Sequence, residues 1–227
     1  MGSIGQFEVL TFDCYGTLID WETGIQTAFK QALTNLGLSK SQENKLFDLY
    51  EKEEKRIEGE KTYRPYRKVL AQALVAAAKT IGKTIPNETS EILAKQLPTW
   101  RAFPDTKPAL ERLAKRYRLG ILSNVDDDLI AGTLRNFTVP FDLVVTAEQV
   151  RSYKPGFMHF ERAQEIIGER KWLHVAASIY HDIEPALELN LSAVWVNRTN
   201  SKEGRNYRGR ILRELETLTQ LADWLAP

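Results

Sequence analysis

The sequence has few of the features that mark specialised classes of protein. It holds one cysteine, Cys14, so it cannot form an intramolecular disulfide, and a cysteine-based zinc cluster is unsupported. Its formal net charge of +1 lacks the basic excess of nucleic-acid-binding domains. Its apolar runs fall far short of the ~20 residues of a membrane span, and residues 1–7 lack the pattern of a signal peptide. We therefore expect a cytoplasmic globular protein that binds neither nucleic acid nor membrane.

The chain is longer than a typical single domain and alternates between two kinds of pattern. At 227 residues it exceeds the usual domain size of about 100 to 200 residues, so a large domain or a core with an insertion is expected. Short apolar segments predict strands, and apolar residues at helical spacing predict helices between them. The predicted strands are residues 7–12, 119–122, 141–145, 172–176 and 193–196, and the predicted helices are residues 108–117, 128–136, 157–167 and 183–189. This α/β alternation predicts a doubly wound, mostly parallel, Rossmann-like sheet.

One long stretch breaks the alternation. Residues 21–101 have apolar residues at helical spacing and no convincing strand. We therefore predict a core formed by residues 1–20 and 102–227, with an inserted all-helical cap domain formed by residues 21–101. Leucines at helical spacing in residues 212–225 predict that the chain closes with one or two helices.

Polar side chains follow four of the five predicted strands. In an open parallel sheet, ligands bind outside the carboxyl ends of the strands, so these positions are candidates for a functional site. The candidates are Asp13, Tyr15 and Thr17 after the first strand, Ser123 and Asn124 after the second, Lys154 after the third, and Ser178 and Asp182 after the fourth.

Four segments that contain these residues resemble, in order, the motifs of the haloacid dehalogenase superfamily. They are FDCYGTLID at 12–20, ILSN at 121–124, YKP at 153–155 and SIYHD at 178–182. The resemblance implies a hydrolase in which Asp13 is a covalent nucleophile, a role that suits a carboxylate when it is ionised and positioned. It also implies that Lys154 keeps Asp13 charged. Thr17, Ser123 and Asn124 would then supply hydrogen bonds around it.

Two departures distinguish between branches of this superfamily. Its phosphatases have a second aspartate where this chain has Tyr15, and a magnesium-binding acid at the position of Ala177. The form Asp-X-Tyr at 13–15 instead resembles the 2-haloacid dehalogenases, which need no metal or other cofactor. That resemblance implies dehalogenation of a small 2-haloacid through an aspartyl ester, with Asp182, alone or with Lys154, acting on the hydrolytic water.

Two other functions stay open. One is a phosphatase of small phosphate esters, for which Mg²⁺ would be the cofactor. The other is a catalytically silent member of the superfamily. A homodimer is a further expectation that comes from the family alone.

The expected substrate pocket also departs from the dehalogenases. Their arginine in the second cap helix aligns with Glu51, a serine and an asparagine of motif four align with Ala177 and Ile179, and an aromatic residue of the halide pocket aligns with His181. We predict Tyr15, Ser178 and His181 as substrate-binding residues of the core.

The cap supplies the other predicted contacts. The segment YRPYR at 63–67 places two guanidinium groups among aromatic rings, and arginine can bind a carboxylate through two hydrogen bonds. Arg64, Tyr66 and Arg67 are therefore the predicted carboxylate clamp, with a solvent-facing helix surface as the alternative. The histidines at 159 and 174 lie in helix and strand contexts and are interpreted as structural residues.

Overall fold

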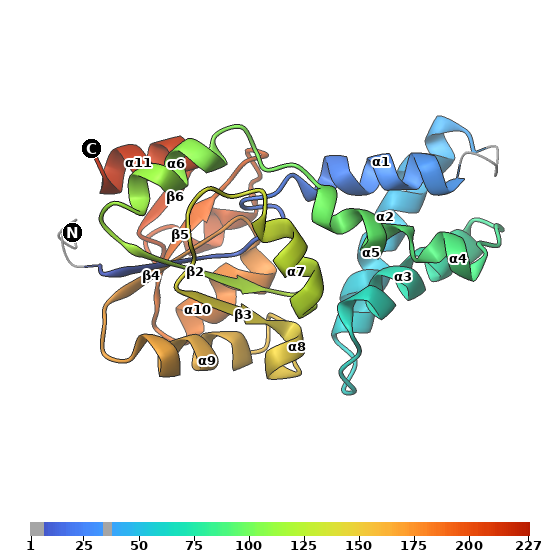
Figure 1. The fold of residues 1–227 in the computed structure, drawn as a ribbon. Helices are drawn as coiled ribbons and strands as arrows, with labels where there is room; N and C mark the ends of the chain where they lie inside the picture. The colour runs from blue at the N-terminus through green and yellow to red at the C-terminus, as the bar shows by residue number, and fades with distance from the viewer. Residues whose placement is uncertain (1–6, 34–37) are drawn as a thin grey trace. The chain divides into compact units, whose positions relative to one another are not determined.

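A computed structural model describes residues 7–33 and 38–227 of the chain (Figure 1). These residues form two compact units. Among the described residues, the core unit comprises 7–20, Arg101–Asn124 and Arg135–Pro227, and the helical unit comprises 21–33, 38–100 and Val125–Leu134. No helix in the described ranges is both long and apolar enough to cross a membrane.

The core unit is built on a six-stranded sheet in the order β3-β2-β1-β4-β5-β6, in which every pair is parallel. The strands are β1 (Val9–Phe12), β2 (Arg118–Ser123), β3 (Leu143–Thr146), β4 (Trp172–Ala176), β5 (Ser192–Val196) and β6 (Arg213–Leu215). The first five correspond to the five predicted strands. The predicted α/β class with a doubly wound parallel sheet is confirmed.

Helices cover both faces of this sheet, with α6 and α11 on one face and α8, α9 and α10 on the other (Figure 1). The helical elements of the core unit are α6 (Thr106–Leu113), α8 (Ala147–Val150), α9 (Met158–Ile167), a π-helical turn η4 (Ile179–Ile183), α10 (Glu184–Glu188), η5 (Glu203–Tyr207) and α11 (Leu218–Leu225). The core packs Phe160 of α9 and Ile183 against strand residues such as Val145 and Trp195. Each large buried apolar side chain contributes about 1.5–3 kcal/mol to the free energy of unfolding, so this cluster of buried side chains is a main source of the stability of the core unit.

Strand β1 lies at the centre of the sheet and leads into the loop with the predicted nucleophile. All four of its residues are buried, as expected for a strand covered on both faces. The backbone N–H of Asp13 donates to the carbonyl of Val175 at 3.1 Å, which extends the ladder one residue past the strand. Gly16 then turns the chain with φ +94°, a conformation that favours glycine.

The prediction that residues 212–225 close the chain as one or two helices is confirmed for the second part of this stretch and is wrong at its start. Residues Arg213–Leu215 form β6, which pairs in parallel with β5 at the edge of the sheet. The helix begins only after Thr217, whose side chain caps it by accepting from the N–H of Gln220. Leucine spacing over this short stretch fits either structure, and pairing with β5 decides between them.

The helical unit contains no strand among its described residues. Its helices are α1 (Trp21–Leu33), α2 (Lys40–Glu58), α3 (Tyr66–Thr80), α4 (Asn87–Ser90), α5 (Ile92–Gln96), η3 (Leu97–Thr99) and α7 (Asp127–Leu134). Helices α2 and α3 pack together, and α3 buries Val69, Leu70, Ala73 and Leu74 at the predicted helical spacing. This unit therefore has an apolar core of its own.

The compact units differ from the predicted domains chiefly in Val125–Leu134, which was expected in the core and groups with the helical unit. Helix α7 packs on η3, where a methyl group on Gly132 would lie 2.6 Å from the Pro98 side chain. The Asp126 carboxylate accepts hydrogen bonds from the N–H groups of Tyr66 and Arg67 at 2.6 and 3.0 Å. It thereby caps the start of α3, a long-range contact that periodicity does not reveal.

The substitution Gly132→Ala tests this contact. In a helix that is free at this face, alanine stabilises by roughly 0.5–1 kcal/mol. We expect the opposite sign here, a loss of about 1–3 kcal/mol, because the methyl group overpacks against the Pro98 ring. Urea unfolding would measure the change, with Gly59→Ala as the control because its methyl group would meet only ordinary contacts. A Gly132→Ala protein more stable than wild type would contradict the packing of α7 on η3.

Candidate active site

The carboxyl ends of β1, β2 and β4 meet at one edge of the sheet and bring most of the predicted site residues together. Asp13 follows β1, Ser123 ends β2, and Asp182 lies in η4 after β4. Lys154 reaches this edge from the loop before α9. All four side chains are buried, Lys154 with a relative exposure of only 1%.

The Lys154 ammonium group lies at the centre of the cluster. Its Nζ donates to Asp13 Oδ1 at 2.9 Å, to Asp182 Oδ1 at 2.5 Å and to the backbone carbonyl of Leu122 at 2.8 Å. An ammonium group has three donors, so all of its hydrogen-bonding capacity is used. Lys154 therefore joins the two carboxylates and has no donor left over.

The pKa values in the cluster move in different directions. Burial lowers the pKa of Lys154, but the neighbouring charges of Asp13 and Asp182 outweigh it and the net shift is upward. Burial raises the pKa of Asp182, but the charge of Lys154 and a hydrogen bond from His174 outweigh it, so that pKa is lowered. For Asp13 burial prevails over the same lysine, and its pKa is raised. Lys154 is thus held as a cation and Asp182 as an anion.

Thr17 fixes the second oxygen of Asp13, the predicted nucleophile. Its hydroxyl donates to Asp13 Oδ2 at 2.8 Å and accepts from the backbone N–H of Ala177 at 2.9 Å. The loop after β1 is thereby tied to the loop after β4. Both oxygens of Asp13 are held, one by Lys154 and one by Thr17, so the carboxylate has a defined orientation.

Asn124 and Ser123 have different surroundings. The Asn124 side chain pairs with the backbone of Lys154, accepting from its N–H at 2.8 Å and donating to its carbonyl at 3.0 Å. It therefore positions the lysine loop. The hydroxyl of Ser123 is fully buried and has no hydrogen-bond partner among the described protein atoms.

The π-helical turn η4 sets the position of Asp182. Ser178 caps it by accepting from the N–H of His181 at 3.1 Å, and its hydroxyl also contacts His181 Nδ1 at 3.2 Å. Asp182 points inward and is 1% exposed, whereas Ser178 and His181 are half-buried. Single π-helical turns are rare and are frequent at functional sites.

Tyr15 lies half-buried in the loop after β1, close to the nucleophile in sequence, and its backbone bridges to Ile19. The other predicted substrate contacts belong to the helical unit and pair within it. Arg64 binds Glu60 at 2.5 Å, Arg67 binds Asp126 and Asp128, and the Tyr66 hydroxyl donates to Glu54 at 2.8 Å. Their roles as a carboxylate clamp stay predictions.

The comparisons with known proteins identify the family of this chain. The model of the haloacid dehalogenase-like hydrolase family matches residues 10–196, a range that contains all four motifs. The chain belongs to this family. No curated protein matches the sequence significantly.

Solved structures of haloacid dehalogenase-like proteins share the fold over nearly the whole chain. The L-2-haloacid dehalogenase RSc1362 has a TM-score of 0.83 at 21% identity, covering 98% of this chain and 100% of its own. The magnesium-bound HAD-hydrolase YfnB from Bacillus subtilis has 0.83 at 17%, covering 97% and 99%. The L-2-haloacid dehalogenase from Xanthobacter autotrophicus with chloropropionic acid covalently bound has 0.73 at 20%, covering 96% and 86%. At these identities the likeness establishes the fold.

Magnesium, which is bound in the YfnB structure, does not fit the residues of this haloacid dehalogenase-like core. A hard cation of this kind takes several oxygen ligands, but position 177, where the resemblance implies a magnesium-binding acid, is alanine. The two carboxylates that remain, Asp13 and Asp182, both bind Lys154. Within residues 7–33 and 38–227, no three His, Cys, Asp or Glu side chains gather in a way that would hold a metal ion.

One contributor to the site was missed in the sequence although it follows the fifth strand. Arg198 donates from Nε and Nη2 to the carbonyl of Thr17 at 3.1 and 2.8 Å, and its Nη1 binds Asp105 at 3.2 Å. Its guanidinium also lies 3.9 Å from the centre of the Phe103 ring. Arg198 thus holds the backbone of the residue whose hydroxyl holds Asp13. Its position two residues after β5 is the feature of the sequence that could have identified it.

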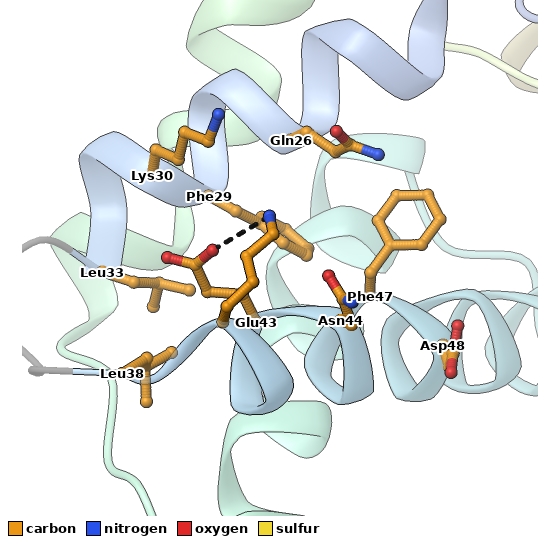
Figure 2. Close-up of a pocket in the computed structure, with 10 residues that line it drawn as sticks. Gln26, Phe29, Lys30, Leu33, Leu38, Glu43, Asn44, Phe47 and Asp48 are labelled. Atoms are coloured by element: carbon orange, nitrogen blue, oxygen red, sulfur yellow. Dashed lines mark hydrogen bonds and ion pairs between the residues drawn. The ribbon is translucent and has the colours of Figure 1, made fainter.

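The helical unit has a cavity of about 620 Å³ between α1 and α2 (Figure 2). Phe29, Leu33 and Phe47 give it an apolar lining, and Lys40 and Glu43, which form an ion pair of 3.3 Å, also line it. None of the predicted site residues lines it. It is separate from the carboxylate–lysine cluster of the core unit.

Replacing Lys154 by methionine tests the energetic role of the cluster. The variant keeps the side-chain volume but leaves two buried carboxylates without a cation, so we expect a loss of about 3–5 kcal/mol in the free energy of unfolding at pH 7. Urea unfolding would measure it. Lys107→Met, at an exposed lysine of the same unit, should change stability by less than about 0.5 kcal/mol.

The stability loss in Lys154→Met should also depend on pH in a defined direction. In the wild type, the lowered pKa of Asp182 contributes stability above its unfolded pKa of about 3.9, and that contribution is lost as the pH falls below this value. In Lys154→Met the pKa values of both carboxyls should be raised, so their contribution is present at low pH and is lost as the pH rises. The deficit relative to wild type should therefore be largest at pH 7 and should shrink toward pH 4. An equal deficit at every pH would contradict this account.

Proposed function

We propose that this protein is a metal-independent hydrolytic dehalogenase of small 2-haloacids. The observation that carries the proposal is the fixed orientation of Asp13. Lys154 donates to one of its oxygens and Thr17 to the other, and the Lys154 ammonium group has no further donor. The residues around it supply neither a second aspartate for a leaving group that needs protonation nor the acid set for magnesium. A halide leaving group needs neither a proton donor nor a metal ion, because it leaves as a stable anion.

The first step is displacement at carbon. An oxygen of Asp13 attacks the carbon that bears the halogen, a carbon–oxygen bond forms, and the carbon–halogen bond breaks with its electron pair on the halide. The product of this step is an ester between Asp13 and the acid. Because attack comes from the side opposite the halogen, the carbon centre is inverted.

The second step is hydrolysis of that ester by water. Asp182 is the base that we propose for it, since it is held as an anion and its Oδ2 has no hydrogen-bond partner among the described protein atoms. Water adds to the carboxyl carbon of Asp13 as Asp182 takes one of its protons. The ester carbon–oxygen bond then breaks, and the 2-hydroxyacid leaves with one oxygen of Asp13 as Asp182 returns that proton to the alkoxide oxygen. The other proton of the water passes to solvent, and Asp13 is regenerated as a carboxylate. Lys154 stays protonated and is not the base, because its donors are all engaged and its pKa is raised.

The carboxylate of the substrate needs a partner, because a desolvated carboxylate without one is costly. Glu51 cannot serve, and burial raises the pKa of its own carboxyl. We keep Arg64 and Arg67 as the proposed anchors. Both are already paired, Arg64 with Glu60 and Arg67 with Asp126 and Asp128, so either would have to exchange a carboxylate partner for the substrate.

A substrate screen tests the reaction class. We expect halide release from chloro- or bromo-substituted 2-haloacids that is unchanged by a chelator, since neither step uses a Lewis acid. The same screen includes small phosphate esters with and without magnesium. Turnover of phosphate esters that appears only with magnesium would replace the proposal by a phosphatase, and absence of all turnover in a folded protein would favour a catalytically silent member.

Isotope labelling tests the covalent step. In a single turnover in oxygen-18 water with enzyme in excess, the label should appear in Asp13, while the hydroxyacid leaves largely unlabelled. Peptide mass spectrometry would measure this. Asp13→Asn should abolish turnover because an amide is a poor nucleophile, whereas Asp182→Asn should form the ester and hydrolyse it slowly. Label found in the product with none in Asp13 would show direct attack by water.

A further inference from the structure

The motif-four positions that offer serine and asparagine in related dehalogenases offer Asp182 no polar side chain in this chain. Ala177 contributes only backbone groups, its N–H to Thr17 and its carbonyl to the Trp195 indole at 2.9 Å. Ile179 is apolar. A carboxylate held only by the shared Lys154 would have to compete with Asp13 for that lysine.

A second partner of Asp182 comes instead from the middle of β4. His174 Nε2 lies 3.1 Å from Asp182 Oδ1, the same oxygen that accepts from Lys154. On its other side, His174 Nδ1 lies 2.9 Å from the Thr11 hydroxyl. The ring is fully buried, and Phe160 packs edge-on against it at 5.1 Å between ring centres.

The sheet register explains why these three groups meet. Thr11 and His174 are direct partners across the parallel pair β1·β4. Side chains alternate along a strand, so Thr11 points to the same side as Asp13, two residues further on. The threonine and the histidine therefore lie under the catalytic cluster, within reach of η4.

The hydrogen-bond chemistry fixes the direction of the contact. An ionised carboxylate only accepts, so the proton must be on Nε2 of His174. When the ring carries this one proton, Nδ1 is an acceptor and the Thr11 hydroxyl can donate to it. The other buried histidine nearby, His159, is bonded to the Ser123 carbonyl at 3.1 Å, and burial lowers its pKa to about 3, so it adds no positive charge near Asp182.

We propose that His174 is a positioning residue for Asp182, that Thr11 holds its ring, and that Asp182 therefore does not depend on Lys154 alone while Lys154 orients Asp13. This inference rests on the proposed function for its kinetic consequence. It concerns the ester-hydrolysis step, because Asp182 acts there and not in the displacement. The pair Thr11–His174 thus takes the place of the polar side chains absent at 177 and 179.

The kinetic test separates the two steps. In His174→Leu, a single turnover of a bromo-substituted 2-haloacid should release halide at nearly the wild-type rate, while hydrolysis slows about ten- to a hundredfold through loss of a hydrogen bond to a charged group. The ester should accumulate as a mass increase of the quenched protein. His174→Gln, which keeps an N–H donor, should restore part of the rate, and Thr11→Val should slow the same step to a smaller extent.

Phe160→Leu is the matched control, because it loosens the packing of the same ring and leaves both hydrogen bonds in place. Hydrolysis in His174→Leu that is no slower than in Phe160→Leu would overturn the proposal. So would an equal slowing of halide release, which would place the effect on Asp13 or Lys154.

A spectroscopic measurement tests the role of His174 without any turnover of substrate. The chain has three histidines, so nitrogen-15 NMR of the imidazoles can be assigned with single substitutions. His174 should carry its proton on Nε2, and Asp182→Asn should shift that nitrogen. An Nδ1–H form would overturn the proposal even in an active enzyme. If the wild type releases no halide, the proposed function fails, and this measurement still decides the role of His174.

Discussion

The site is organised around one buried cation. The Lys154 ammonium group is removed from water, which costs several kcal/mol for an ion of this size, and three acceptors offset that cost. Two of these acceptors are carboxylates, so the cluster carries one more negative than positive charge when both are ionised. Burial raises the pKa of Asp13, whereas Lys154 and a hydrogen bond from His174 together lower the pKa of Asp182.

Much of the surrounding structure keeps this arrangement in place. Asn124 binds both backbone groups of Lys154, Thr17 holds Asp13, and Arg198 holds the backbone of Thr17. Asp105 links that arginine to the start of α11 by accepting from the N–H of Leu218 at 2.7 Å. Each side chain that touches a reacting group is thus held by another, and such support gives a site the precision that catalysis requires.

The chemistry that this cluster supports follows from what it contains. In the proposed mechanism Lys154 orients Asp13 but cannot accept a proton, because it is already protonated, so Asp182 is the base. The helical unit adds a separate apolar core and the two arginines proposed as anchors. One of these arginines, Arg67, also has a structural role. Asp126 accepts from its backbone N–H at the start of α3 and pairs with its guanidinium group.

Local sequence signals determined the α/β alternation, the helical insertion and the positions of Asp13, Ser123, Lys154 and Asp182, because strand ends and motif order are readable along the chain. They did not determine β6, which depends on pairing with β5, nor the grouping of α7 with the helical unit, which depends on contacts at Pro98 and Asp126. Likewise His174 reads as an ordinary strand residue and Arg198 as a loop residue. Only the parallel register of β1 and β4 places His174 beside Thr11 and Asp182, because contacts between residues distant in sequence arise from the packing of whole elements.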